Sequence, residues 1–338
     1  MRTTVRLVTL VASVITPVAT LAAQEARTLS VRVGDERGGA VAGATVRFDG
    51  LAQLGRTTDA GVATITVPEC GTRTIVTARA TDHATASRRA LTCWRDTLPL
   101  LVRSLASLAG LTGGGAGGAV LGRVRDVRGA PLAGATVRLG GAGLEATTDS
   151  LGRFGLTGVA AGSYLLRVRA PGRVMAQLGF DLAPREVREF LLQLDDMSVT
   201  LPRDSARLLA GDDGTDAQLH ELEARRGARG DRFGVSVSRE TLLAHEDGRR
   251  ILGCTLSRVP DVWRLFPEFT PGRCLDFNPC VTINGRMRAN LSLAMLPADR
   301  VEFVELHRSF TEYTAALGEQ APGCAVQARA VLWLRTDG

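Results

Sequence analysis

Apolar and polar residues alternate in steps of two along much of the first two thirds of the chain. Ala44, Val46 and Phe48 would share one face, with polar residues between them, and the run 164–169 alternates in the same way. A period of two is typical of a half-buried β-strand. Residues that favour turns separate these runs about every ten residues, as in a β-sandwich. The pattern predicts a mainly β chain.

A repeat underlies this pattern. Residues 42–47 recur unchanged as residues 133–138, an offset of 91 positions. Residues 57–59 also match residues 147–149 if one residue is skipped between the copies. Such self-similarity indicates two copies of one folded unit. Because each copy holds several short strands with turns between them, we expect two β-sandwiches of about 75 residues each.

The repeat divides the chain into units. We expect a leader at 1–23, a diverged sandwich at 28–102, a Gly-rich linker at 103–118, a second sandwich at 119–195, a further linker at 196–214 and a small α+β unit at 215–338. The expected fold class is therefore mainly β, with two sandwiches and a smaller α+β unit at the C-terminal end.

The C-terminal unit carries local signals of its own. Residues 233–237 alternate as a strand, and Ser238 is a suitable N-cap for a helix that begins at Arg239. Asn284-Gly285 stands between alternating apolar residues, which is the strongest short signal of a β-hairpin.

Two further helices and two strands are expected in this unit. Leu219 and Leu222 lie three residues apart on a polar segment, which fits a short surface helix. Residues 296–302 also begin like a helix. Residues 304–306 and 331–334 have the character of closing strands.

The composition excludes several protein classes. Of 338 residues, 45% are hydrophobic and 22% are charged, which argues against a disordered chain and against a channel. All 41 basic residues are arginines and the net charge is +6, but no basic cluster with aromatic neighbours is present. We therefore expect no nucleic-acid partner.

The N-terminus has the order of a secretory signal peptide. Arginines precede the apolar run 7–18, and the small residues of 19–23 come before polar Gln24. A membrane anchor is the alternative, but a spanning helix needs about 20 apolar residues and polar residues interrupt this run. We expect cleavage at the end of residues 1–23, export, and no transmembrane segment in the mature chain.

Six cysteines follow the leader: Cys70, Cys93, Cys254, Cys274, Cys280 and Cys324. An even number of cysteines in an exported protein indicates disulfides. Cys70 and Cys93 are alone in the first sandwich, so we expect them to pair. The four cysteines of the C-terminal unit allow three pairings, and they lack the close spacing typical of a zinc site.

No catalytic, metal or cofactor site is predicted. His220 and Glu223 have the His-x-x-Glu spacing that metallocarboxypeptidases use for zinc, but no third ligand is marked out. Their segment is polar and rich in arginine, which favours a solvated helix face.

Trp263 is the candidate ligand contact, because an aromatic ring can stack on a sugar and this one lies between Pro260 and Pro267. For the other aromatic candidates, packing is the simpler interpretation; they are Trp94, Trp333, Tyr164 and Tyr313.

The second repeat carries a family motif. It reads Gly122-x-Val124-x-Asp126-x-x-Gly129-x-Pro131-Leu132-x-Gly134-Ala135-x-Val137, then Thr148-Asp149-x-x-Gly152-x-Phe154 and Gly162-x-Tyr164. Residues 119–195 resemble the carboxypeptidase regulatory-like domain, a transthyretin-like β-sandwich, and residues 28–102 resemble a diverged copy. The resemblance implies a noncatalytic spacer or binding module, and some such domains are grouped with carbohydrate-binding folds.

Motifs of the C-terminal unit carry a second resemblance. They are Leu256-Ser-Arg258-Val259-Pro260-Asp-Val262, Cys280-Val281-Thr-Ile283-Asn284-Gly285, Leu296-Pro-Ala-Asp299-Arg300-Val301-Glu302-Phe-Val304-Glu305 and Val331-Leu-Trp333. They resemble the plug domain of TonB-dependent outer-membrane receptors, although that family usually has Asp-Gly in place of Asn284-Gly285. No run of alternating strands of about ten residues remains for a barrel, so we expect no transport activity.

Together the resemblances imply a noncatalytic binding or scaffolding protein in the periplasm or at the outer-membrane periphery. An outer-membrane protein or an envelope polysaccharide is the implied partner. Two alternatives stay open: an accessory subunit that gates or seals a separate barrel, and a secreted hydrolase with an unrecognised site. A plug-like sheet would also bring Cys280 and Cys324 together, which leaves Cys254 with Cys274.

Overall fold

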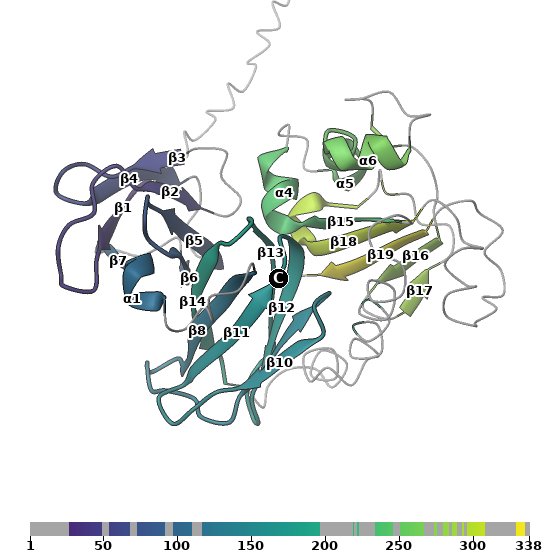
Figure 1. Ribbon diagram of the computed structural model, residues 1–338. Helices are drawn as coiled ribbons and strands as arrows, with labels where there is room; N and C mark the ends of the chain where they lie inside the picture. Colours follow the sequence, from purple (N-terminus) through teal and green to yellow (C-terminus); the bar gives the residue numbers. More distant parts are fainter. Residues whose placement is uncertain are drawn as a thin grey trace, which may run out of the picture.

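The computed structural model contains two β-sandwiches and a C-terminal α+β unit (Figure 1). It describes residues 27–48, 54–67, 73–91, 97–109, 117–196, 219, 222, 234–245, 251–266, 274–275, 280–283, 286–288, 293, 296–307 and 329–334. The leader predicted at 1–23 lies outside the described residues.

The first unit is a sandwich of two sheets. Its strands are β1 (Arg27–Gly34), β2 (Thr45–Phe48), β3 (Leu54–Arg56), β4 (Val62–Val67), β5 (Arg73–Arg79), β6 (Thr85–Leu91) and β7 (Leu98–Leu101). One sheet has the order β4-β1-β7, and the other contains β3-β2-β5-β6. Ala44, Val46 and Phe48, which were predicted to share one face, are buried in the core of this unit.

The second unit repeats this arrangement. Its strands are β8 (Gly118–Asp126), β9 (Thr136–Gly140), β10 (Leu144–Thr147), β11 (Arg153–Val159), β12 (Gly162–Arg169), β13 (Ala176–Leu182) and β14 (Val187–Leu194). The strand order β11-β8-β14 corresponds to the order β4-β1-β7 of the first unit. The order β10-β9-β12-β13 corresponds to β3-β2-β5-β6. The predicted mainly β fold class is confirmed.

Two threonines fix how the copies correspond. The Thr57 hydroxyl accepts a hydrogen bond from the Ala44 N–H at 2.8 Å, and the Thr148 hydroxyl accepts one from the Ala135 N–H at 2.8 Å. Thr57 is therefore equivalent to Thr148 and not to Thr147, so the one-residue gap predicted between the copies is wrong. The offset of 91 holds through this part of both units.

The two sandwiches share one sheet. β6 of the first unit pairs in parallel with β14 of the second, which gives a seven-stranded sheet of order β11-β8-β14-β6-β5-β2-β3. Ala86 faces the first core, whereas Phe190, which lies opposite Ser87, faces the second. The two sandwiches are thus built on opposite faces of a continuous sheet, and backbone hydrogen bonds join them.

The C-terminal unit is a five-stranded sheet with helices on one face. Its elements are β15 (Gly234–Ser238), α4 (Arg239–Ala244), α5 (Leu252–Leu256), α6 (Pro260–Leu265), β16 (Cys280–Ile283), β17 (Arg286–Arg288), η3 (Ala298–Arg300), β18 (Val301–His307) and β19 (Arg329–Leu334). The strand order is β15-β18-β19-β16-β17. The helices pack on one face of this sheet, and the second sandwich covers the other (Figure 1).

Two local predictions for this unit are confirmed. The Ser238 hydroxyl accepts a hydrogen bond from the Thr241 N–H at 3.2 Å and caps α4, which begins at Arg239. β16 and β17 pair antiparallel on either side of residues 284–285, as the hairpin signal predicted.

The helix predicted at 296–302 is wrong. Only Ala298–Arg300 form a short 3-10 helix, and Val301 and Glu302 already belong to β18. Every residue of β18 is buried, because the helices cover one face of the sheet and the second sandwich covers the other. The strand predicted at 304–306 is confirmed as part of β18, but its first residues were not recognised, because a strand buried on both faces shows no period of two.

Two segments outside these strands are packed into the molecule. Leu219 and Leu222 are helical, as predicted, but both are fully buried and do not lie on a surface helix. Within the segment predicted as a linker at 103–118, Leu105–Leu108 form α1. Leu108 is buried in a small apolar cluster with Leu121 and other residues.

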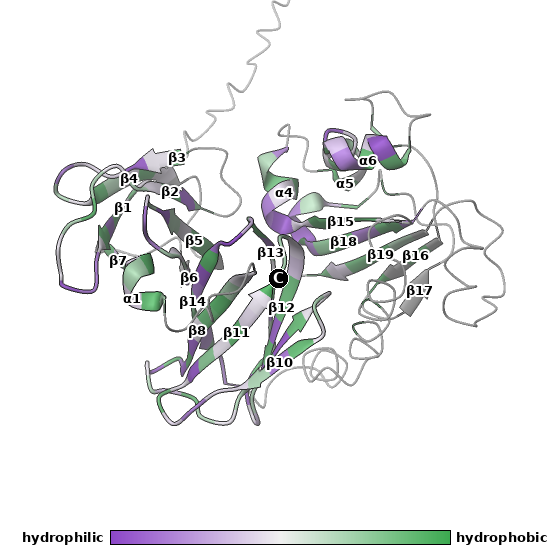
Figure 2. Cartoon of the chain, in the orientation of Figure 1, coloured by the Kyte–Doolittle hydropathy of each residue, from purple (hydrophilic) through white to green (hydrophobic). Residues whose placement is uncertain are grey.

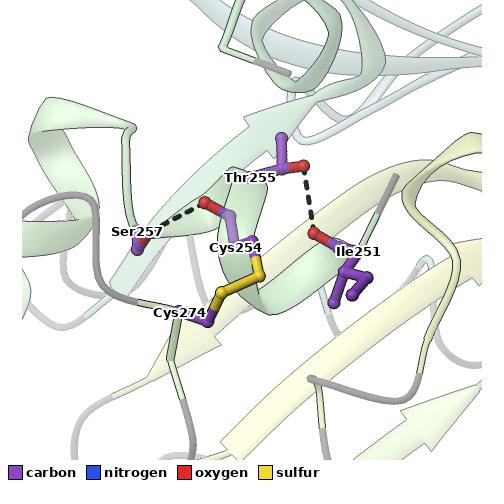
Figure 3. The surroundings of a disulfide bond; sticks show 5 residues. All are labelled: Ile251, Cys254, Thr255, Ser257 and Cys274. Atoms are coloured by element: carbon purple, nitrogen blue, oxygen red, sulfur yellow. Dashed lines mark hydrogen bonds between the residues drawn. A yellow bond between two sulfur atoms is a disulfide. The ribbon is translucent and has the colours of Figure 1, made fainter. Parts of the chain in front are cut away.

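One disulfide lies in the C-terminal unit. Cys254 on α5 is bonded to Cys274, as Figure 3 shows, and this predicted pairing is confirmed. Cys70, Cys93 and Cys324 lie outside the described residues. Cys280 begins β16, and its pairing with Cys324 stays a prediction.

Replacing Cys254 and Cys274 by alanine is expected to destabilise the C-terminal unit by about 3 kcal/mol, the amount expected when a loop of this length is no longer closed. The two residues are separated by 20 positions, and Cys254 is buried. Urea unfolding under oxidising conditions measures the effect. Reducing the wild type opens this disulfide and the other predicted ones, so it should lower the midpoint at least as far as the double substitution does. An unchanged midpoint in the variant would contradict a stabilising disulfide.

Among the residues that the structure describes, every helix is too short or too polar to cross a bilayer.

Candidate functional site

The three units meet around the side chain of Arg188. This residue lies on β14 of the second sandwich, close to the edge that it shares with β6 of the first. Its side chain is only 1% exposed, which is rare for an arginine. A charge at this depth requires partners, and these come from all three units.

The guanidinium of Arg188 makes a two-pronged ion pair with Glu240 on α4. Nη1 donates to Glu240 Oε2 at 2.8 Å and Nη2 donates to Oε1 at 2.5 Å. Nη2 also donates to the Ser87 hydroxyl of the first sandwich at 3.1 Å. Nη1 donates to the Asp181 carbonyl at 3.0 Å. This fork geometry is the strongest that a carboxylate and an arginine can form.

Aromatic rings enclose the same guanidinium. Its central carbon lies 5.1 Å from the centroid of Phe180 and 5.2 Å from that of Phe190. Both distances are within the range of a cation–π contact. The rings make the surroundings of the ion pair less polar and so strengthen it.

Glu240 connects the C-terminal unit to both sandwiches. Its backbone carbonyl accepts a hydrogen bond from Arg47 Nη2 on β2 of the first sandwich at 3.0 Å. Burial alone would raise the pKa of the Glu240 carboxyl, but the charge and hydrogen bonds of Arg188 outweigh it and lower the pKa to about 2. The start of α4, which carries Glu240, is hydrophilic (Figure 2).

Carboxylates of the C-terminal unit also satisfy the edge of β13, which is the end strand of its sheet. The Gly179 N–H donates to Glu302 Oε2 and the Asp181 N–H donates to Glu240 Oε2, both at 3.1 Å. An end strand offers unpaired backbone donors, and here two of them are satisfied by side chains of another unit.

Gly179 also allows a close backbone approach. A Cβ at this position would lie 1.9 Å from the Glu302 carbonyl oxygen and 3.1 Å from the Arg239 nitrogen. Both are backbone atoms, so neither can rotate away. The position therefore requires glycine if β13 and β18 are to meet.

An apolar cluster completes the contact between the second sandwich and the C-terminal unit. Leu165, on the outer face of β12, packs with Phe303 of β18 and Trp333 of β19, together with the two buried leucines Leu219 and Leu222. The rings of Phe303 and Trp333 are 5.4 Å apart, edge to face. All five side chains are fully buried.

The junction leaves too little space for a substrate. The cavity beside Arg188, Glu240 and Glu302 has a volume of about 20 Å³, which is room for about one water molecule. A carboxylate with a strongly lowered pKa in a cleft can mark a catalytic site. Here a buried arginine holds that carboxylate beside a cavity too small for a substrate, an arrangement that fixes the units in place and that we call the Arg188–Glu240 lock.

The sequence-predicted site residues lie apart from this junction. Trp263 is 38% exposed on α6, on the face of the C-terminal sheet opposite the second sandwich. Trp333 and Tyr164 are buried, so packing is confirmed as their role. His220, Glu223, Trp94 and Tyr313 lie outside the described residues.

Arg188 was not predicted from the sequence, although a signal was present. Phe190, Leu192 and Leu194 follow it in steps of two and are buried in the second core. Extending this alternation backwards places Arg188 on the inner face. A charged residue in phase with an apolar face indicates a buried ion pair, but the sequence does not reveal its partner in α4.

The family comparison agrees with the sandwich geometry. The model of the carboxypeptidase regulatory-like domain matches residues 119–195. Residues 119–195 form a carboxypeptidase regulatory-like domain. The matched residues span β8 to β14 and carry Arg188 and Gly179, and the C-terminal unit also contacts Arg47 of the first sandwich. The predicted resemblance of this stretch is confirmed, and the likeness of 215–338 to a plug domain stays a prediction.

None of the curated proteins matches the chain. Among solved structures, the Bacillus anthracis TIE protein is 17% identical, with 50% of this chain and 34% of that chain covered and a TM-score of 0.21. A cohesin–X-dockerin complex from Acetivibrio cellulolyticus gives 24% identity, coverage of 23% and 57%, and a TM-score of 0.21. The shaft pilin SpaA from Lactobacillus rhamnosus GG gives 11% identity, coverage of 52% and 100%, and a TM-score of 0.22. The chain thus spans about a third of the length of the TIE protein and about three fifths of the matched chain of the cohesin–X-dockerin complex.

Proposed function

We propose that this chain is a noncatalytic binding or scaffolding protein of the cell envelope, in which the three units act as one block. The observation that carries the proposal is the Arg188–Glu240 lock. Among the described carboxylates, Glu240 has the most lowered pKa, and its charge is used to hold the units together. A protein whose buried charges fix the relative positions of its units is suited to presenting surfaces at fixed distances.

The shared sheet supports the same function. Two sandwiches joined by a flexible linker would move independently, whereas β6 and β14 join these two through backbone hydrogen bonds. The partners that this proposal implies are an outer-membrane protein or an envelope polysaccharide, and Trp263 is an exposed aromatic side chain that a partner could reach.

Turnover assays test the noncatalytic part. We expect the purified protein to leave peptide and glycan substrates unchanged over long incubations. Hydrolysis that persists through repurification, and that a single substitution of a buried carboxylate such as Glu302 abolishes without unfolding, would contradict the proposal. The Asp261→Ala variant, which changes an exposed carboxylate on α6, is the matched control.

The location in the envelope gives a separate prediction. We expect the mature protein, expressed in a bacterium with two membranes, to be recovered from the periplasm or the outer-membrane periphery with residues 1–23 removed. The reason is the order of charged, apolar and small residues at the N-terminus. N-terminal sequencing of the fractionated protein measures this. Recovery of Met1 from the cytosol would contradict export.

A further inference from the structure

A groove lies on one face of the shared sheet, between that face and β7 of the first sandwich. Its volume is about 180 Å³, and its lining comes from four strands, β6, β7, β8 and β14. Pro99 and Leu101 form one side, and Leu101 is 53% exposed. The groove lies where the first sandwich meets the carboxypeptidase regulatory-like domain, so neither unit contains it alone.

Three arginines line this groove. Arg88 on β6 and Arg123 on β8 both lie opposite Leu191 of β14, so they stand in one row, two strand spacings or about 10 Å apart. Arg125 lies two residues beyond Arg123 and therefore projects from the same face, about 7 Å along the strand. The groove thus presents a row of cations with regular spacing.

The acidic residue of the lining already has a partner. Glu189 is engaged by Arg103, whose Nε lies 2.8 Å from the Glu189 carboxylate. Arg88 is positioned by a hydrogen bond from its Nη1 to the Pro99 carbonyl at 2.8 Å. Backbone hydrogen bonds lower the pKa of the Asp149 carboxyl, and the nearby charge of Arg123 helps to lower it. Arg125 lies beside Arg88. Burial lowers the pKa of Arg88, and the nearby charge of Arg125 lowers it further.

The sandwich fold does not require the second of these charges, that of Arg125. At the offset of 91, Arg123 corresponds to Arg32 on β1, which is exposed, and Arg125 corresponds to Gly34. The first sandwich forms without a cation at the second of these positions. Arg125 therefore adds a positive charge that the sandwich fold can omit, and it adds that charge beside two other arginines, so an anion that binds there stabilises the cluster.

The geometry points to this groove as a binding site for an anionic glycan, whose carboxylate or phosphate groups contact Arg123 and Arg125 and whose sugar rings lie against Pro99 and Leu101. Planar guanidinium groups bind such anions through paired hydrogen bonds. Apolar side chains beside them suit the C–H faces of sugar rings, which an inorganic ion lacks. This proposal rests on the proposed function, because only an exported protein would encounter an envelope glycan.

Binding of defined glycans by calorimetry at low salt tests the site. We expect the full-length protein to bind polygalacturonate, which carries carboxylates, or phosphomannan, which carries phosphates, and to show no binding of neutral dextran. Whichever anionic glycan binds more tightly identifies the source of the anion. The Arg123→Gln and Arg125→Gln variants should each weaken binding about fivefold and the double variant more than about 20-fold. Binding should also weaken as salt is added.

The Arg32→Gln variant is the matched control, since it removes the same charge from the equivalent strand of the first sandwich. It should bind within about twofold of the wild type. Equal losses in this control and in the double variant would overturn the site, because binding would then follow net charge. Equally tight binding of polyglutamate would overturn the glycan assignment. Absence of binding to both anionic glycans would overturn the site while leaving export and the absence of turnover, which are measured separately, unaffected.

Discussion

Replacing Glu240 by alanine is expected to lower the free energy of unfolding by about 3–5 kcal/mol and to loosen the C-terminal unit from the two sandwiches. The variant leaves the Arg188 guanidinium, only 1% exposed, without its carboxylate. An uncompensated buried charge is far more costly than the loss of a surface pair. Urea unfolding measures the stability, and limited proteolysis detects release of the C-terminal unit.

The chain offers a control for this prediction. Asp261 and Arg264 form an ion pair on α6 at 2.8 Å, with side chains 62% and 79% exposed. The Asp261→Ala variant should change stability by less than about 1 kcal/mol. A double variant, Arg188→Met with Glu240→Leu, should recover much of the loss because no buried charge remains. A Glu240→Ala protein as stable as the wild type would contradict the lock.

The same substitution has a pH signature. The pKa of Glu240 is lowered from 4.5 to about 2 in the folded protein, so its ion pair contributes fully above about pH 4.5 and is lost as the pH falls through 2. The difference in unfolding free energy between wild type and Glu240→Ala should therefore shrink by about 3 kcal/mol between these limits. A difference that stays constant down to pH 2 would show that the carboxylate charge is not what stabilises the junction.

Replacing Gly179 by alanine is expected to separate β13 from β18 and to cost about 3 kcal/mol or more. The new Cβ would lie 1.9 Å from the Glu302 carbonyl oxygen, and only backbone movement can relieve this clash. The hydrogen bond from the Gly179 N–H to Glu302 would be lost with it. Thermal unfolding measures the loss, and faster proteolysis of the C-terminal unit locates it.

Gly155→Ala is the matched control for this variant. Gly155 lies on β11 of the same sandwich, and a Cβ there would meet only the Cδ2 of Leu121 at 3.3 Å, the end of a flexible side chain. Alanine in a strand also loses less conformational entropy on folding than glycine. The control should therefore stay within about 1 kcal/mol of the wild type. If Gly179→Ala behaves like the control, β13 and β18 do not make the close approach described.

The repeat and the two sandwiches could be predicted because their signals are local. The alternation at Ala44, Val46 and Phe48 depends on one strand with one buried face. The Ser238 cap and the hairpin at residues 284–285 each depend on a few neighbouring residues. The disulfide between Cys254 and Cys274 was reached only through a family resemblance, because spacing alone allows three pairings.

The junction could not be predicted because its parts are distant in the sequence. The parallel pairing of β6 with β14 joins residues about a hundred positions apart, and Glu240 reaches Arg188 from another unit. Strand propensity does not indicate which edge strands meet. The burial of β18 on both faces likewise follows from the docking of the second sandwich, which local pattern rules do not include.

Hydrogen exchange followed by nuclear magnetic resonance tests most directly whether the three units form one block. Amides of the β6–β14 pairing, together with the Gly179 and Asp181 amides that donate to Glu302 and Glu240, should exchange as slowly as those between β12 and β13 inside one sandwich. They should also lose protection in the same cooperative step. Exchange of these amides at the rate of the exposed end strand β3, while the sandwich cores stay protected, would show three tethered units and contradict the block.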